Sequence, residues 1–151
     1  MEMYNRFMPQ FRFYYPIEVR YGDLDPQGHV NNAKYLTYIE HARIAYIRSL
    51  GLWNSDSFLE IGMILAEARV TYLTPILYTH QVSVGVRVTR IGNKSMAMDY
   101  SLEDRESGAV LATGSAVLVS YDYRTSKTKP VPANWREAIE TYEELPAATH
   151  L

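Results

Sequence analysis

Residues 20–35, RYGDLDPQGHVNNAKY, crowd two aspartates, a histidine and two asparagines directly before a long amphipathic pattern. Pro26 and Gly28 mark the same stretch as a turn. Carboxylates can act as nucleophiles or as general bases on water. The first turn of a helix offers backbone N–H groups without intrahelical partners, and these can stabilise an oxygen that becomes anionic. An aspartate just before a helix is therefore suited to acyl transfer.

A carboxylate is a weak attacking group, so the acyl compound needs a good leaving group. A thiol with a pKa of about 8.5 leaves as a thiolate at neutral pH without a strong general acid, and the sequence therefore favours a thioester as substrate. A purely structural role stays open, because Asp and Asn are common turn residues and an acidic group near a helix start is favourable. Asp23 fits that role well, as a residue that closes the preceding strand.

Other chemistries find little support in the sequence. DLDPQG copies the first half of a calcium loop, but Lys34 occupies the position at which calcium requires a bidentate glutamate. The four histidines have no paired short spacing, so we predict no metal site. No G-x-S-x-G elbow, P-loop or G-x-G-x-x-G fingerprint is present, which argues against a serine hydrolase, nucleotide hydrolysis and a dinucleotide cofactor. The absence of cysteine excludes a thiol nucleophile.

Composition is typical of an ordinary globular protein. The 151 residues are 47% hydrophobic and 21% charged, with a net charge of −2, and we expect one domain over residues 1–151. A chain without excess positive charge is a poor partner for nucleic acid. The first sixteen residues place arginines among aromatics, so we expect no signal peptide, no membrane span and a cytoplasmic location.

Hydrophobic periodicity predicts the elements that position the turn. Alternation from Ile17 to Tyr21 indicates a strand, and three- and four-residue spacing from Asn32 to Leu50 predicts a helix of about five turns. Asn31 or Asn32 can cap this helix. Four further strands are predicted within 64–75, 81–91, 95–103 and 109–123, with a helical turn possible within 51–62 and a short helix at 134–144. The order predicts an α+β fold in which an antiparallel sheet wraps one long helix.

The run YGDLDPQGHVNNAKYLTYIEHAR, together with VTYLTP, IGNKS and YDYRT, resembles the hotdog-fold acyl-CoA thioesterases of the 4-hydroxybenzoyl-CoA thioesterase group. The resemblance covers roughly residues 15–132. It implies a five-stranded antiparallel sheet around one central helix, with two subunits joined at their sheet edges into homodimers or homotetramers. It also implies a hydrolase that cleaves acyl-CoA thioesters, with no cofactor besides the coenzyme A of the substrate.

The resemblance assigns the catalytic carboxylate to Asp25 and the oxyanion amide to the helix start nearest Asn32, with Val30 and Asn31 beside it. His29 lies near the acyl group in relatives, where it acts directly or shapes the loop. Lys94 and Ser95 match the pair that holds the phosphates of coenzyme A, although Gly92 and Asn93 stand where the hydroxybenzoyl enzyme has arginines. Further substrate-binding candidates are Tyr35, then Glu67, Arg69 and Tyr72 from a partner's second strand, and Arg87 and Arg90, which are otherwise solvated strand cations.

Two other functions remain open for this sequence. The same fold hosts hydratases and dehydratases that use a histidine on hydroxyacyl or enoyl thioesters, and His29 keeps that possibility. A noncatalytic acyl-thioester binding module is the other, because a fold does not fix a function. Glu40 and Arg43, three residues apart on the predicted helix, are expected to form a structural ion pair.

Overall fold

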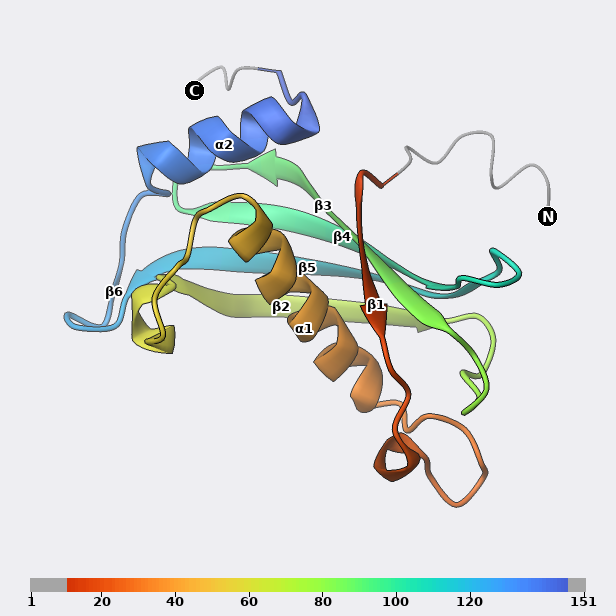
Figure 1. The fold of residues 1–151 in the computed structure, drawn as a ribbon. Helices are drawn as coiled ribbons and strands as arrows, with labels where there is room; N and C mark the ends of the chain where they lie inside the picture. Colours follow the sequence, from red (N-terminus) through yellow and green to blue (C-terminus); the bar gives the residue numbers. More distant parts are fainter. Residues whose placement is uncertain (1–10, 147–151) are drawn as a thin grey trace.

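An antiparallel sheet curls around one long helix in this protein (Figure 1). The computed structural model describes residues 11–146. The strands are β1 (Phe13–Ile17), β2 (Met63–Tyr72), β3 (Val82–Ile91), β4 (Ser95–Asp104), β5 (Val110–Asp122) and β6 (Lys127–Thr128). The helices are α1 (Lys34–Ser49) and α2 (Ala133–Glu143), and two short 3-10 turns are η1 (Tyr21–Asp23) and η2 (Phe58–Glu60). This arrangement confirms the predicted α+β class.

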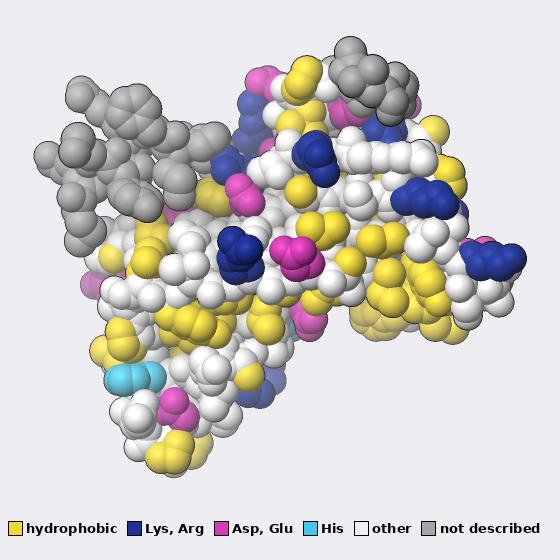
Figure 2. Space-filling model, turned by 180° about the vertical axis from the view of Figure 1, so that it is seen from behind, with side chains coloured by type: hydrophobic (Ala, Val, Ile, Leu, Met, Phe, Trp, Pro, Cys, Tyr) yellow, Lys and Arg dark blue, Asp and Glu magenta, His cyan; other side chains and the backbone are white. Residues whose placement is uncertain are grey.

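The sheet has the strand order β1-β3-β4-β5-β2, and the short β6 pairs with β5. Every pairing is antiparallel, so the five main strands form the predicted sheet and β6 is an addition to it. Strands β1 and β2 are its two edges, and α1 lies across the concave face (Figure 1). Seen from behind, apolar and charged side chains are interspersed (Figure 2).

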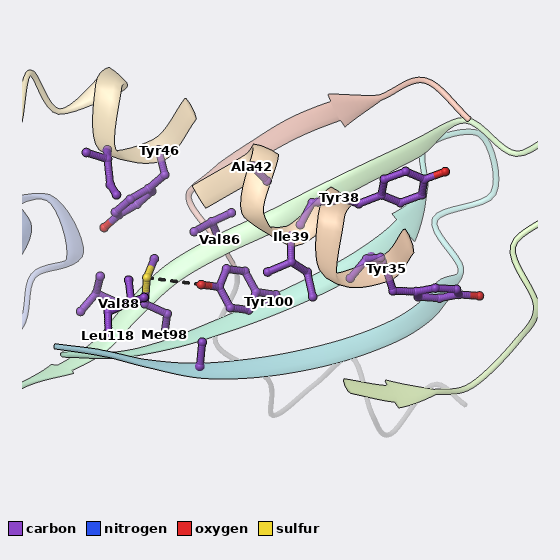
Figure 3. Close-up of a cluster of buried hydrophobic side chains, with 14 of the residues drawn as sticks. Tyr35, Tyr38, Ile39, Ala42, Tyr46, Val86, Val88, Met98, Tyr100 and Leu118 are labelled. Atoms are coloured by element: carbon purple, nitrogen blue, oxygen red, sulfur yellow. Dashed lines mark hydrogen bonds between the residues drawn. The ribbon is translucent and has the colours of Figure 1, made fainter. Parts of the chain in front are cut away.

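The core forms where the apolar stripe of α1 meets the sheet. Tyr38, Ile39 and Tyr46 recur at helical spacing and are almost completely buried (Figure 3). They pack with side chains of three strands: Val86, Val88, Met98, Tyr100 and Leu118. Gly114 allows this close approach, because a Cβ there would lie 3.1 Å from Cδ1 of Ile39.

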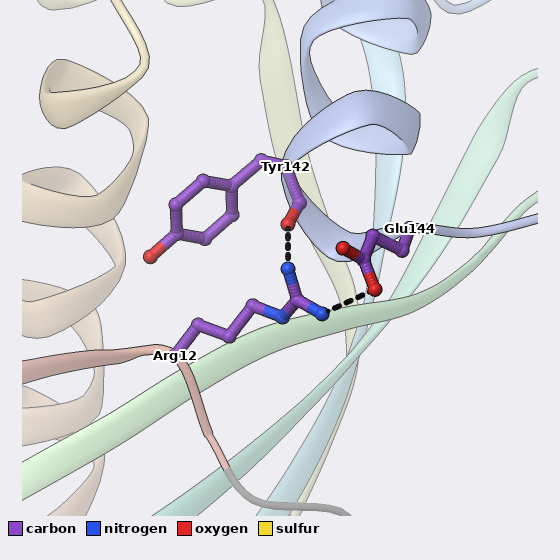
Figure 4. A network of polar contacts seen from close by, with 3 residues as sticks. All are labelled: Arg12, Tyr142 and Glu144. Atoms are coloured by element: carbon purple, nitrogen blue, oxygen red, sulfur yellow. Dashed lines mark hydrogen bonds and ion pairs between the residues drawn. The ribbon is translucent and has the colours of Figure 1, made fainter.

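Helix α2 closes the end of the fold away from the start of α1. Its last turn is linked to β1, because Arg12 donates hydrogen bonds to the Tyr142 carbonyl at 3.0 Å and to the Glu144 carboxylate at 2.6 Å (Figure 4). The Tyr46 hydroxyl of α1 donates to Glu143 at 2.7 Å. These contacts fix the C-terminal half of α1. No helix between residues 11 and 146 combines the length and the apolarity needed to cross a membrane.

Element boundaries differ from the sequence prediction at the turn of interest. Strand β1 ends at Ile17, and the alternation beyond it covers a loop in which Val19 is buried and the first residue of η1, Tyr21, which is 84% exposed. Helix α1 begins at Lys34, and its N-cap residue Ala33 makes no side-chain capping bond. The residue directly before the helix is thus not an asparagine, but the Asn31 side chain accepts the Ala33 amide at 2.9 Å, so Asn31 does satisfy a backbone amide at the start of the helix, as the sequence suggested. The helical turn within 51–62 and the short C-terminal helix are confirmed.

Candidate active site

The turn between β1 and α1 closes as a small hairpin. Leu24 and Val30 form an antiparallel bridge, the Asp25 amide donates to the His29 carbonyl at 2.8 Å, and the Gly28 amide donates to the Asp25 carbonyl at 3.0 Å. Gly28 has a φ of +80°, which a residue without Cβ adopts at low cost. The backbone therefore presents Asp25 and His29 side by side at the mouth of the hairpin.

The segment that contains Ile76 and Leu77, between β2 and β3, holds this hairpin in place. The Val30 amide donates to the Ile76 carbonyl at 2.8 Å, and His29 bridges to Leu77. The Ile76 amide in turn donates to the Tyr35 hydroxyl of α1 at 3.2 Å. Backbone and side-chain hydrogen bonds at Ile76 therefore join the 23–33 loop to helix α1, and they fix the shape of the loop.

The two aspartates have different surroundings. Asp23 is buried, and its Oδ2 accepts the Tyr38 hydroxyl at 2.6 Å and the Arg20 amide at 3.0 Å. Asp25 is half-buried, and its Oδ1 accepts the Gln27 amide at 2.9 Å. Its Oδ2 accepts no hydrogen bond from any residue within 11–146. Asp23 therefore holds the loop onto α1, as predicted for a turn residue, and Asp25 has an oxygen available for chemistry.

The pKa of Asp23 supports its role as an anchor. Desolvation is the largest influence and raises the pKa, but hydrogen bonds from Tyr38 and from the Arg20 amide lower it. The positive charges of Lys34 and Arg20 act in the same direction, and the net result is a pKa below the ordinary value. Sequence reasoning did not single out Tyr38. Its signal was a hydroxyl-bearing ring on the buried stripe of a helix, where such a group requires a partner.

One backbone amide at the start of α1 remains open. The Asn32 N–H donates no hydrogen bond to the part of the chain that the structure describes, and Asn32 is exposed. Its neighbours all donate at 2.8–2.9 Å: Val30 to Ile76, Asn31 to Asp23, Ala33 to the Asn31 side chain and Lys34 to the Asn31 carbonyl. Because the partial positive charge of the helix concentrates here, the Asn32 amide is suited to polarise a carbonyl. The amides of Val30 and Asn31, predicted to stand beside it, are used by the fold.

The far end of β2 reaches the same place. The Tyr72 hydroxyl donates to the Asn32 carbonyl at 3.0 Å, and the Tyr72 ring meets the Tyr35 ring edge-on with 4.8 Å between centroids. Burial is the largest cause of a raised pKa at Tyr35, and the nearby charge of Asp25 adds to it. Tyr72 therefore contacts Asn32, through its carbonyl, within the same protomer and not only from a partner as predicted, and Tyr35 packs on Tyr72.

The turn predicted to bind phosphates lies elsewhere in the protomer. Ile17, which leads into the 23–33 loop, pairs with Val82 at the start of β3. Ile91 at the end of β3 is nine residues further, about 30 Å along a strand, and the 92–95 turn follows it. One copy of the chain therefore holds the loop and this turn at opposite ends of the sheet. Within residues 11–146, the side chain of Lys94 makes only a long contact, 3.5 Å from its Nζ to the Thr128 hydroxyl.

The remaining strand candidates are not gathered at the loop. Arg87 forms an ion pair with Asp99 at 3.0 Å and lies over the Phe11 ring, so it is a packed strand cation and not the solvated one of the alternative prediction. Arg90 is exposed near the end of β3, beyond a register shift. Val70 packs against the core, so strand alternation turns Glu67, and likewise Arg69, to the opposite face of β2.

The predicted ion pair on α1 is wrong. Glu40 is exposed, and among residues 11–146 it forms no ion pair with Arg43. Arg43 is 8% exposed and donates instead from Nε to the Tyr100 hydroxyl at 2.8 Å. Helical spacing places the two side chains near each other, but the Arg43 guanidinium points toward the sheet, where Tyr100 of β4 accepts its hydrogen bond.

Comparison with known proteins identifies the family of this chain. Residues 19–139 match the family model described as the Thioesterase-like superfamily. The long-chain acyl-CoA thioesterase FadM of Escherichia coli is 29% identical over 82% of this chain and 94% of its own. A thioesterase from Thermus thermophilus, crystallised with coenzyme A and Zn, is 36% identical with a TM-score of 0.81, over 93% of this chain and 100% of that one.

The Staphylococcus aureus DHNA-CoA thioesterase is 26% identical with a TM-score of 0.77, over 87% of this chain and 91% of that one. These likenesses confirm the predicted hotdog fold. Since the matched model spans most of the residues, this chain belongs to the Thioesterase-like superfamily.

Proposed function

We infer that this protein is an acyl-CoA thioesterase, and we propose that Asp25 and the Asn32 amide carry the reaction. The observation behind the proposal is that one short loop holds a carboxylate oxygen that receives no hydrogen bond from residues 11–146 and a backbone N–H that donates none to them. Neighbouring groups of the same kinds, in Asp23 and Asn31, are used by the fold. The free pair supplies an attacking or basic group and an oxyanion donor, which thioester hydrolysis requires.

Two routes use this pair. As a base, Asp25 takes a proton from water, and the resulting hydroxide adds to the thioester carbon while the Asn32 N–H donates to the developing oxyanion. The C–S bond then breaks, and the thiolate takes the proton held by Asp25. As a nucleophile, Asp25 adds to the same carbon, expels the thiolate and forms an anhydride that water cleaves. Label found in Asp25 after a single turnover in ¹⁸O-labelled water would establish the nucleophilic route, because only water attack at the Asp25 carbonyl of the anhydride puts label in the protein.

His29 is proposed as a loop-shaping residue. Its carbonyl accepts the Asp25 amide and its backbone bridges to Leu77, so the backbone already has a structural task. Its side chain forms no hydrogen bond within the described residues. A His29→Asn variant should keep most of the hydrolysis under this proposal, and loss of activity with an intact fold would assign it a direct role.

We propose further that two copies pair through β2, as the edge of each sheet permits. One side of β2 pairs with β5, and the other side forms no strand pairing within residues 11–146. A ten-residue edge with exposed apolar side chains is a ready template for another strand. The exposed apolar residues of β2 and the position after it are Ile64, Leu65, Tyr72 and Leu73.

Antiparallel pairing of β2 with its own copy would complete the site. The Tyr72 end of β2 lies at the 23–33 loop, whereas the Met63 end pairs with Ser120, whose amide donates to the Lys94 carbonyl at 2.7 Å. An antiparallel partner reverses these ends, so it brings its own Lys94 turn toward the loop. The separation within one protomer is then consistent with a shared substrate site.

Two variants test the pairing. Ala68→Glu puts like charges near each other at the centre of a paired β2, where opposed like charges are destabilising, so we expect a monomer with strongly reduced hydrolysis. Ala109→Glu adds the same charge at an exposed turn and serves as control. Light scattering with size-exclusion chromatography reports the assembly. An Ala68→Glu protein that stays dimeric or tetrameric would contradict the proposed edge.

A thiol-release assay tests the activity. The chain contains no cysteine, so a thiol reagent reports released coenzyme A alone. Short, long and aromatic acyl-CoAs define the substrate class, and a preference for aromatic acyl groups would support placement in the 4-hydroxybenzoyl-CoA thioesterase group. Consumption of an enoyl-CoA without thiol release would instead support the hydratase function and overturn the hydrolase.

A further inference from the structure

The segment between β2 and β3, residues 73–81, lies beside the candidate active-site loop (Figure 1). It meets the loop at two neighbouring residues: the Ile76 carbonyl accepts the Val30 amide at 2.8 Å, and Leu77 forms an antiparallel bridge with His29. The Ile76 side chain is completely buried. The position of the loop therefore depends on the shape of this segment at Ile76 and Leu77.

His80 closes a turn that begins at the second of these residues. Its backbone amide donates to the Leu77 carbonyl at 3.0 Å, which closes a four-residue turn, and its Nδ1 accepts the Leu77 amide at 2.9 Å. Within residues 11–146 the Leu77 amide donates to no other acceptor. Loss of the imidazole would therefore remove one of the two hydrogen bonds that join the ends of this turn.

The acceptor role of Nδ1 fixes the protonation state of the ring. A ring nitrogen accepts a hydrogen bond only when it carries no proton, and in a neutral imidazole the other nitrogen then carries it. The geometry therefore requires a neutral His80 with its proton on Nε2. A proton on Nδ1 would set two N–H groups against each other and break the hydrogen bond to the Leu77 amide.

The turn is connected to the open amide of Asn32. Ile76, the residue before the turn, accepts the Val30 amide, two positions ahead of Asn32. The Ile76 amide donates to the Tyr35 hydroxyl of α1 at 3.2 Å. If the turn loosened, the Ile76 carbonyl would move, and the Val30 amide would become a second donor beside Asn32.

The turn is also connected to the carboxylate of the loop. Leu77 bridges to His29, and the His29 carbonyl accepts the Asp25 amide at 2.8 Å. We propose that His80 is a positioning residue for the proposed thioester hydrolysis: its Nδ1 accepts the Leu77 amide and thereby keeps the loop in its reactive shape. This inference rests on the proposed function of the loop, and His80 acts through Leu77 and not on the substrate.

The tautomer of His80 gives the first test, which needs no turnover. Long-range ¹H–¹⁵N correlation spectra of the unmodified protein report the ring nitrogens of its four histidines, and His80→Asn assigns one set of signals by its loss. A ring nitrogen that carries a proton differs in chemical shift from one that does not. We expect an unprotonated Nδ1 and a protonated Nε2 at neutral to alkaline pH. A proton on Nδ1 would overturn the proposal, whether or not the protein hydrolyses thioesters.

Two variants separate the acceptor from the rest of the ring. The side-chain oxygen of asparagine stands where Nδ1 stands, one bond beyond Cγ, whereas the oxygen of glutamine reaches the position of Nε2. His80→Asn should therefore keep the hydrogen bond to the Leu77 amide and most of kcat. His80→Gln should lose it, and kcat should fall about five- to tenfold with a smaller change in KM, because a hydrogen bond between neutral groups is worth about this factor.

Hydrogen exchange at the Val30 amide reports the position of the loop without any chemistry. Exchange should be faster in His80→Gln than in the unmodified protein and unchanged in His80→Asn. Equal exchange and equal kcat in the two variants would refute the proposal, since the acceptor at Nδ1 would then have no effect. If none of the proteins hydrolyses a thioester but only His80→Gln exchanges faster at Val30, the proposed function fails and His80 remains the residue that positions the loop.

Discussion

The substitution Asp25→Asn separates chemistry from structure most cleanly. In the folded protein Asp25 is half-buried, and its side chain accepts one hydrogen bond from residues 11–146, from the Gln27 amide to Oδ1. Asparagine has the same shape and keeps that acceptor, so the free energy of unfolding should change by no more than about 0.5 kcal/mol. The amide can neither attack a thioester nor take a proton from water. We expect kcat to fall by a factor of about 10²–10⁴, the usual contribution of a positioned base.

The matched variant is Asp23→Asn, two positions away in the same loop. Its oxygen accepts the Tyr38 hydroxyl and the Arg20 amide, and hydrogen bonds to a charged group each contribute about 1.5–3 kcal/mol. This variant should lose stability by about that amount, and its activity should fall only as far as the loop loosens. Urea unfolding measures the first effect and thiol release the second. Full activity in Asp25→Asn, or equal losses in both variants, would refute the assignment of the two carboxylates.

Three further outcomes follow from the same geometry. Because the pKa of Asp23 is lowered in the fold, its stabilising contribution is complete above the ordinary pKa of about 3.9 and is lost as pH falls through the folded value; urea unfolding across acidic pH should show this loss, and Asp23→Asn should lack it. Gly114→Ala should cost about 1–3 kcal/mol in chemical denaturation, since the new Cβ crowds Ile39 and a backbone carbonyl. An unchanged midpoint would contradict that packing. Tyr72→Phe removes the hydrogen bond to the Asn32 carbonyl and should lower kcat several-fold with a stability change of about 1 kcal/mol or less; unchanged kcat would separate Tyr72 from the site.

The sequence predicted the long elements well because each has one dominant period. The stripe from Tyr35 to Ile47 lies on the buried face of α1, and the alternating valines of β3 form a strand, as expected. Local patterns decide such elements, since apolar residues on one face need only a core on that face. The start of α1 was harder to predict, because it depends on which amides the side chain and the carbonyl of Asn31 accept. Asn31 bonds the Ala33 amide ahead of the first helical residue, so the helix begins later than the pattern suggests.

Ion pairing was the less predictable part of the helix surface. Spacing brought Glu40 and Arg43 within reach, but it could not reveal that the Tyr100 hydroxyl, 57 residues away in the sequence, would accept from the guanidinium. Arg43 is buried because the sheet curls around α1 and covers this side of the helix. A long-range contact of this kind has no local signature, so the sequence could not show that the ion pair would be missing.

Long-range hydrogen bonds also decide which backbone amide is open at the start of α1. The family resemblance pointed to three neighbouring residues, and within residues 11–146 the structure leaves one of their amides without an acceptor. Val30, Asn31 and Asn32 are adjacent and equally plausible as donors from their position before a helix. The choice is made by Ile76 and by Asp23, whose carbonyls accept the first two amides. The Asn32 amide is the one that these carbonyls do not accept. Substitutions that move Ile76 away should therefore free the Val30 amide, which could then compete with the Asn32 amide as hydrogen-bond donor to the oxyanion. The position of the oxyanion would then depend on Ile76 and Asp23, which accept the neighbouring amides, as much as on the Asn32 amide that donates to it.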